Sequence, residues 1–478
     1  FKKKNVLNIN KLFTKKKITN LVVVIALLPM FISQKYHEDF GYYHLPYALA
    51  FIEDKIVFGF ANIDKSFVYN SIWLNLYPIF FLDNKNFNFL TLPSFLLFLS
   101  FTLFSINKLF KKSYVGVSEY YLIIVLFYFL LKFTRISEFG VDFAATIYSV
   151  LSIFYFLRFY ENNREYEKKI HFYLNLTFSF FSILIKLSTA PIILLPLYLY
   201  FTNFKNLKFY IFDIKFLLIY FVTCVFLIQQ FIYTGCVFFP TNFTCLNTSW
   251  FNPDYLNLSK NLELTNKSYS LAKDKYTPEE YLTNFTWFIF WIKRSFIEII
   301  EHLMTMILPS LIFFLFLKKN KKVLLFNQRS ILYIFCLVSL IYWLNFSPVF
   351  RFSIPFFVTL VFLVLSNFFT LKKFSFNIFI IFFTIFLIFS VSKNSLRIYG
   401  SEKIFLGIQT IENKYKINET YSNKYANIYY PDIKKNKKNG WQGRLCWNTP
   451  FICSYNKLEV QMKSGYLILS KIKKNNND

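Results

Sequence analysis

Two adjacent carboxylates follow the first hydrophobic run of the chain, in the sequence QKYHEDFGYYHLPYA that begins at Gln34. Glu38 and Asp39 repel each other, and desolvation near a bilayer disfavours a charged carboxyl group. A carboxyl group in such surroundings is suited to act as a general base. The structural alternative is a solvated loop beside the membrane.

Two histidines flank this acidic pair. His37 and His44 are able to join a divalent metal site, but their spacing fits ordinary hydrogen bonding better. We therefore assign no metal ligands, and the participation of a divalent ion stays an open alternative. His44 is kept as a candidate substrate-binding residue.

A second charged group lies in RISEFGVDFA, which contains Arg135, Glu138 and Asp142. Charges this dense at the end of a span face a cavity or pair with one another. A simple surface pair between Arg135 and Glu138 explains the pattern equally well. Arg135 and Asp142 are candidate substrate-binding residues.

Two cations complete the set, Lys186 in ILIKLSTAP and Arg351 in WLNFSPVFRFSIPFF. A guanidinium group binds phosphate with two hydrogen bonds and stays charged near lipid. Phosphate binding is the functional hypothesis for both residues. A snorkelling lysine and an interfacial arginine anchor are the structural alternatives.

Hydrophobic runs must position these residues. Hydrophobic residues make up 55% of the 478 residues and charged residues 17%, too much apolar surface for a water-soluble protein. The apolar residues are grouped in uncharged runs that are long enough to cross a bilayer as helices. We predict an all-α polytopic membrane protein with about eleven transmembrane helices. The predicted spans are 18–33, 89–106, 118–134, 143–160, 171–187, 189–202, 212–234, 296–317, 330–346, 353–369 and 376–392.

The net charge of +28 has an uneven distribution. Lysine and arginine gather in 1–17, 318–329 and 370–375, which the positive-inside rule assigns to the cytoplasm. This pattern favours a lipid bilayer over nucleic acid as the partner. We expect an uncleaved N-terminal anchor, a cytoplasmic N-terminus, a true start upstream of Phe1, and a location in a bacterial inner (plasma) membrane.

An odd number of spans places the C-terminal segment outside the cytoplasm. The predicted outer segments are 34–88, 135–142, 235–295 and 393–478. We divide the chain into a transmembrane domain, 1–392, and a small extracytoplasmic α+β domain, 393–478. The basic charge of the second domain would favour the cytoplasm in a short loop, but long domains are translocated largely regardless of charge.

The outer segments contain their own predicted elements. Aromatic, apolar stretches in 45–82 and 285–296 are typical of helices that lie in the membrane interface. Strands are expected at 426–430 and 457–469.

Four cysteines lie in the predicted outer segments, as two closely spaced pairs. Cys236 with Cys245, and Cys446 with Cys453, are each near enough in sequence to form a disulfide, and disulfides persist in an oxidising compartment. Zinc binding is the competing interpretation of CWNTPFIC, but two thiols without a nearby histidine make a poor site. We predict both disulfides.

Four short motifs follow one another along the chain: HEDFGYYHLPYA after the first span, KLSTAPIILLPL, TGCVFFP at the start of a large outer loop, and SPVFRFSIP. They resemble the GT-C class of integral membrane glycosyltransferases, and more closely uncharacterised bacterial membrane proteins with a CW-x5-C tail. The sequence has no Gly-rich phosphate loop, no G-x-S-x-G and no H-E-x-x-H, which argues against nucleotide, serine or zinc hydrolysis.

The resemblance implies transfer of a sugar from a polyprenyl-phosphate donor to a cell-envelope glycan, lipid or protein acceptor, with inversion, outside the cytoplasm. Asp39 would be the catalytic base, with Glu38 as its neighbour or substitute. Arg351 would hold the donor phosphate with help from Lys186. The chain departs from the family at Phe352, where an Arg-Tyr pair is frequent and a hydroxyl is lost.

Two other functions fit a membrane protein of this kind. A transporter or flippase of lipid-linked glycans predicts paired repeats and charges in the middle of spans, and we find neither in the sequence. The basic C-terminal segment, with its predicted disulfide, would suit a non-catalytic protein of envelope assembly.

Overall fold

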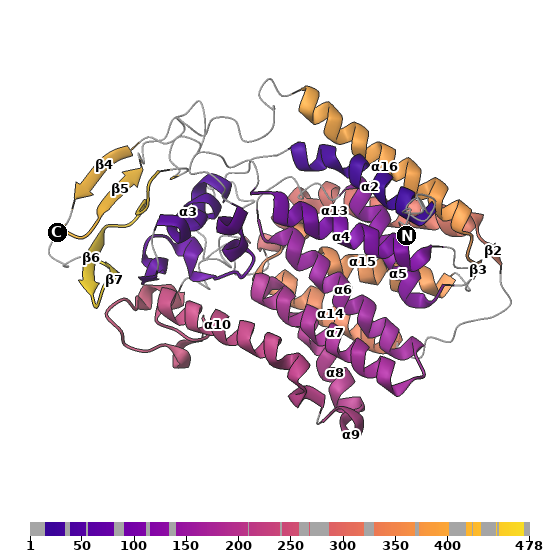
Figure 1. Cartoon of the computed structure of the whole chain (residues 1–478), viewed down its shortest axis with the longest axis horizontal. Coiled ribbons are helices and arrows are strands. Elements are labelled where there is room, and N and C mark those ends of the chain that lie inside the picture. The colour runs from indigo at the N-terminus through magenta and orange to yellow at the C-terminus, as the bar shows by residue number, and fades with distance from the viewer. Residues whose placement is uncertain are drawn as a thin grey trace, which may run out of the picture.

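The protein, described from a computed structural model, is mostly helical with a small region of strands near the C-terminus (Figure 1). The structure describes residues 15–33, 39–53, 56–80, 90–110, 115–132, 140–208, 210–239, 241–257, 267, 286–319, 329–368, 372–400, 417–422, 424–431, 446 and 449–472.

A helix lies in each segment that was predicted to span the membrane. These helices are α2 (Lys15–Ile32), α4 (Leu92–Leu109), α5 (Val117–Leu131), α6 (Asp142–Glu161), α7 (Glu165–Ile185), α8 (Leu194–Thr202), α10 (Leu217–Thr234), α13 (Thr286–Phe316), α14 (Arg329–Phe346), α15 (Phe350–Phe368) and α16 (Phe376–Tyr399). Short 3-10 helices, η6 (Leu187–Ile193) and η8 (Ile214–Phe216), precede α8 and α10, and α9 (Phe204–Leu207) follows α8.

The prediction of about eleven spans is wrong, because fewer of the described helices have the length and the apolar composition that a span needs. Among the described residues, six helical segments are long and apolar enough to cross a membrane, or seven if a bent pair counts as one span. The six are Leu92–Leu109, Asp142–Glu161, Ile214–Thr234, Thr286–Phe316, Arg329–Phe346 and Phe376–Tyr399. The other predicted runs form helices that are short, as α5 is, or that carry a charged first turn, as the EYEKK start of α7 does.

Helix α5 lies inside the bundle. All its residues from Val117 to Leu130 are buried, because α4, α6, α13, α15 and α16 pack around it. A helix that is apolar on every side needs apolar neighbours on every side. Its 15 residues extend about 22 Å, less than the thickness of the hydrocarbon layer.

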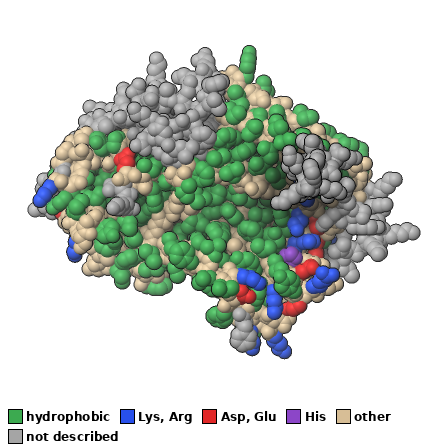
Figure 2. All heavy atoms as spheres, viewed as in Figure 1, with side chains coloured by type: hydrophobic (Ala, Val, Ile, Leu, Met, Phe, Trp, Pro, Cys, Tyr) green, Lys and Arg blue, Asp and Glu red, His purple; other side chains and the backbone are tan. Residues whose placement is uncertain are grey.

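The outer helices expose apolar side chains. Phe221 of α10, Leu315 of α13, Ile341 of α14 and Ile388 of α16 are all more than half exposed. Figure 2 shows hydrophobic side chains over most of the visible surface of the bundle. Such a continuous apolar surface fits hydrocarbon rather than water. The chain is therefore an integral membrane protein.

The described residues of 40–80, 235–257 and 417–472 pack together at one end of the bundle, and we call this unit the cap (Figure 1). Its main sheet has the order β1-β7-β6, with β1 (Val57–Phe58) parallel to β7 (Tyr466–Lys471) and β6 (Leu458–Lys463) antiparallel to β7. A second sheet pairs β4 (Ile417–Ser422) with β5 (Asn427–Pro431). The strand that was predicted at 426–430 is β5, and the stretch that was predicted at 457–469 forms the hairpin of β6 and β7. Strands β1 and β4 were not predicted from the sequence.

Gly59 and Asn62 connect the three parts of the cap. The Asn62 amide donates to the carbonyl oxygens of Trp250 and Leu469, both at 2.9 Å. Gly59 has a φ of +72°, and a Cβ there would lie 2.1 Å from the Leu469 carbonyl oxygen. Only glycine fits this conformation and this close approach.

Both predicted disulfides are present in the cap, Cys236–Cys245 and Cys446–Cys453. The two stretches that were predicted to form interfacial helices have other structures. Within 45–82, α3 (Leu45–Glu53) packs into the cap with most of its residues buried, and short 3-10 turns follow it. The stretch 285–296 is no separate element, because α13 runs without a break from Thr286 to Phe316.

Two lysine-rich loops meet at the other end of the bundle. Strand β2 (Lys318–Lys319) pairs with β3 (Lys372–Lys373), far from the cap (Figure 1). The described parts of the two lysine-rich loops, which the positive-inside rule assigns to the cytoplasm, therefore lie at the end opposite the cap. The cap contains described residues of the predicted outer segments 34–88, 235–295 and 393–478. Which end faces the cytoplasm stays a prediction.

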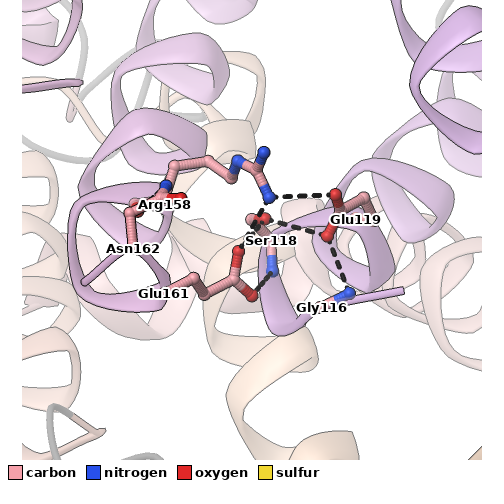
Figure 3. A network of polar contacts seen from close by, with 6 residues as sticks. All are labelled: Gly116, Ser118, Glu119, Arg158, Glu161 and Asn162. Atoms are coloured by element: carbon pink, nitrogen blue, oxygen red, sulfur yellow. Dashed lines mark hydrogen bonds and ion pairs between the residues drawn. The ribbon is translucent and has the colours of Figure 1, made fainter. Parts of the chain in front are cut away.

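A buried polar network joins α5 and α6 at this second end (Figure 3). The Arg158 guanidinium lies 3.1 Å from Glu119 and 3.4 Å from Glu161. The Gly116 N–H donates to Glu119, and the Ser118 N–H donates to Glu161. A Cβ on Gly116 would lie 2.3 Å from the Glu161 Oε1 atom, so the two carboxylates leave room only for glycine.

We predict that Gly116→Ala destabilises the bundle by roughly 1–3 kcal/mol, because the added methyl group displaces a hydrogen-bonded carboxylate. Thermal unfolding of the purified protein in detergent measures the change. Gly400→Ala is the matched control, since the nearest atom to its added Cβ is 3.3 Å away. Equal melting temperatures for wild type and Gly116→Ala would contradict the prediction.

Candidate functional site

Three helices direct charged side chains to one point at the cap end of the bundle. Asp142 begins α6, Lys186 directly follows α7, and Arg351 lies in the first turn of α15. Lys186 donates a hydrogen bond to Asp142 Oδ1, and Arg351 Nε lies 2.9 Å from Asp142 Oδ2. Both oxygens of this carboxylate are therefore held by cations.

Asp39 joins this cluster from the cap side. Its Oδ2 atom lies 3.9 Å from the terminal nitrogen NH2 of Arg351, a looser contact than that of Asp142. The Asp39 side chain is 31% exposed, against 14% for Asp142. Four residues that the sequence analysis singled out, from segments far apart in the chain, thus form one chain of ion pairs.

Tyr43 lies one helical turn after Asp39, at the end of the π-helical turn η1 (Phe40–His44). Burial raises the pKa of the Tyr43 phenol well above its usual value, and the nearby negative charges of Asp39 and Asp142 raise it further. The phenol therefore stays neutral over the physiological pH range and can donate a hydrogen bond beside the carboxylates.

Tyr77 and Gly140 set the position of Asp142. The Gly140 N–H donates to the Tyr77 hydroxyl at 3.0 Å, and this hydroxyl donates to the Gly140 carbonyl at 3.2 Å. Gly140 has a φ of +148°, and a Cβ there would lie 3.3 Å from the ring of His44. The backbone just before Asp142 therefore needs glycine and is held by the cap.

The break between α7 and η6 positions Lys186. Its backbone is extended, with φ −154° and ψ 117°, so the side chain leaves the helix toward Asp142. The buried Thr189 hydroxyl donates to the Lys186 carbonyl at 2.8 Å, and Ser182 donates to Thr189 at 2.9 Å. Thr189 of the KLSTAP motif thus stabilises the break.

Two indole groups hold the loop that carries Arg351. Trp291 Nε1 donates to the carbonyl of Pro348, and Trp343 Nε1 donates to the carbonyl of Val349 at 2.8 Å. Both tryptophans are buried. They fix the turn that precedes α15, so they act on the guanidinium through the backbone.

The Phe352 ring packs against both cations. The Lys186 Nζ atom lies 3.2 Å from the ring centroid, and the Arg351 Cζ atom lies 5.1 Å from it. Cation–π attraction holds a cation over an aromatic face. The ring at this position therefore has a defined contact even though the hydroxyl expected from the resemblance is missing.

The remaining predicted residues have different positions. His44 is buried, and its ring packs on Tyr43 with centroids 4.2 Å apart. Glu38, Arg135, His37 and Glu138 lie outside the described residues. Within the described ranges, no group of three or more His, Cys, Asp or Glu side chains is arranged to hold a metal ion.

No prediction from the sequence included Tyr77, Trp291 or Trp343, and none gave Tyr43 a role. Tyr43 had a usable signal, because a residue four positions after Asp39 lies on the same face of a helical turn. Tyr77 and Trp291 act through backbone that lies 63 and 57 residues away, and no local pattern reveals such contacts. Trp343 is bonded to the nearer Val349, six residues later in the chain.

The cluster combines two cations with two carboxylates of different exposure. Lys186 and Arg351 converge on one acidic group, so an anion such as a phosphate that reaches this point would meet both cations. Asp39 borders the same position from the cap. The arrangement is suited to bind a phosphate and to offer a carboxylate next to it.

We predict that Asp142→Asn destabilises the protein by roughly 1–3 kcal/mol, since it removes the anion that Lys186 and Arg351 share. Inorganic phosphate should partly restore the melting temperature, because it replaces the lost negative charge, while sodium chloride at equal ionic strength should not. Asp254→Asn, which removes the exposed ion pair with Lys471 at 3.0 Å, is the control. A phosphate effect that is the same for both variants would contradict the prediction.

Comparison with known proteins places the chain in a family without assigning an activity. No curated protein and no solved structure matches the chain significantly. A family model described as a domain of unknown function, DUF8201, matches residues 1–358, which include all four residues of the ion-pair cluster. The chain therefore belongs to the DUF8201 family.

Proposed function

We propose that this protein is a glycosyltransferase that moves a sugar from a polyprenyl-phosphate donor to a cell-envelope acceptor on the extracytoplasmic side of the membrane. One observation carries the proposal: Asp39, Asp142, Lys186 and Arg351 converge at one end of a membrane bundle. A lipid-linked phosphate lies at headgroup depth, next to the ends of the spans. The resemblance of the four sequence motifs to GT-C enzymes adds the reaction class.

The cap end of the bundle is the extracytoplasmic end in this proposal. The lysine-rich β2 and β3 lie at the opposite end, which the positive-inside rule assigns to the cytoplasm. Disulfides in the cap support the same orientation, because they persist outside the reducing cytoplasm.

The proposed reaction is a single displacement at the anomeric carbon of the donor sugar. The acceptor hydroxyl oxygen forms the new bond to this carbon, while the bond from the carbon to the phosphate oxygen breaks. Asp39 takes the proton of the acceptor hydroxyl. Polyprenyl phosphate departs with the bonding electrons, and Arg351 and Lys186 stabilise its negative charge. The configuration at the anomeric carbon is inverted.

The two carboxylates take different roles. Lys186 and Arg351 hold both oxygens of Asp142, so this group keeps the two cations together. Asp39 is more exposed and more loosely paired, so it is the better candidate for the base. No step in this reaction requires a metal ion.

The decisive experiment measures sugar transfer by the purified protein in nanodiscs that contain synthetic polyprenyl-phosphate sugars. We expect release of polyprenyl phosphate and a slower reaction by about 100-fold or more in Asp39→Asn, because general-base catalysis contributes this much. Arg351→Lys should raise the KM for the donor, since lysine cannot make the two-point contact of a guanidinium group. Asp254→Asn, which removes an ion pair with Lys471 outside the cluster, should have wild-type activity.

The result also separates the competing functions. Retained turnover in Asp39→Asn would remove its role as the base. Movement of an intact labelled lipid-linked sugar across a proteoliposome membrane, without transfer, would replace the proposal with a transporter. Binding of envelope components without transfer or movement would favour an assembly protein.

A further inference from the structure

The loop between the two cysteines Cys236 and Cys245 has one buried face and one apolar exposed face. Cys236 and Phe239 are buried against Ala61 and Val68 of the cap. The opposite face shows its apolar side chains to the surroundings: Val237, Phe238, Phe243 and Leu246 are 40%, 48%, 90% and 57% exposed. Phe243 is among the most exposed large hydrophobic side chains of the described chain.

This loop is closed and braced, so its apolar face is presented in a defined orientation. The disulfide joins its ends, and the Val237 N–H donates to the Thr244 carbonyl at 3.1 Å. The Leu246 N–H donates to the Gly235 carbonyl at 2.9 Å, directly after the last residue of α10. Exposed aromatic side chains on a rigid loop lose little conformational entropy when they become buried in a lipid bilayer.

The apolar face continues the lipid-facing surface of α10. Phe221, Val225 and Ile228 of this helix are 64%, 45% and 59% exposed. No charged residue occurs from Phe216 to Pro253, a stretch that includes the helix and the whole loop. In Figure 2 the surface over α10 is largely green, and the charged side chains gather instead near α8 and α9.

We propose that the disulfide-closed loop 236–246 is a membrane anchor that inserts Phe238 and Phe243 into the bilayer interface next to the end of α10. Aromatic side chains prefer this interface, and a shallow insertion of about 5–10 Å is sufficient to bury them. The loop packs on the cap through Phe239 and Cys236. Its insertion therefore holds the cap against the membrane surface, on the side where α10 leaves the bilayer.

The test places a spin label on the loop and measures its depth in the membrane. Cys224→Ser and Cys336→Ala remove the two free thiols, and both disulfides are kept by working without a reducing agent. A nitroxide label is then attached to Phe243→Cys in the full chain, in nanodiscs of bacterial phospholipid composition. Collision with oxygen reports a lipid environment, and collision with a soluble nickel chelate reports water.

We expect the label at position 243 to collide with oxygen in preference to the nickel chelate. Met462→Cys is the matched control, because its side chain is 46% exposed on β6 of the cap and should collide with the chelate. Equal chelate access at both positions would overturn the anchor. A label at 243 that is shielded from both reagents in detergent and nanodiscs alike would also overturn it, and would indicate contact with a second protein copy.

Discussion

The carboxylate of Asp142 ties together three helices at the cap end of the bundle. It belongs to the first turn of α6, and its two oxygens meet Lys186 after α7 and Arg351 in α15. At 14% exposure the group has lost most of its water, and its two ion pairs with Lys186 and Arg351 offset this loss. If one partner moved, the other charges would lose their compensation. The positions of the three helix ends are therefore coupled to one another.

The surrounding structure works to keep that meeting point in place. The hydroxyl of Tyr77 holds the backbone before Asp142, and the indoles of Trp291 and Trp343 hold the backbone before Arg351. These are neutral hydrogen bonds to carbonyl and amide groups, which suit a region next to lipid because they add no charge. The cap contributes Tyr77, and Asp39 directly precedes the first residue of the cap, so the cluster is complete only when the cap and the bundle are packed together.

The two ends of the molecule differ in the way they use buried charge. At the cap end, two carboxylates meet two cations and the cluster is partly exposed. At the far end, Glu119 and Glu161 share the single Arg158, and backbone N–H groups of Gly116 and Ser118 supply further donors (Figure 3). The first arrangement keeps its charged groups partly exposed, between 14% and 31% for the four side chains. The second closes the helix ends against each other and has a structural role.

The sequence alone determined the membrane class, the positions of the long helices and the two disulfides, and its candidate site residues included the four residues of the cluster. Each of these follows from a local signal: an uncharged run, a short cysteine spacing, or a charge at the end of a run. The tertiary structure decided the number of helices able to span a bilayer, because α5 is short and buried inside the bundle, which a hydrophobic run cannot reveal. It also decided that Asp142, rather than Asp39, is held by both cations, and that Trp291 and Trp343 support Arg351. Except for the bond from Trp343 to Val349, six residues later, those contacts join residues far apart along the chain. Their distances are set by packing rather than by sequence spacing.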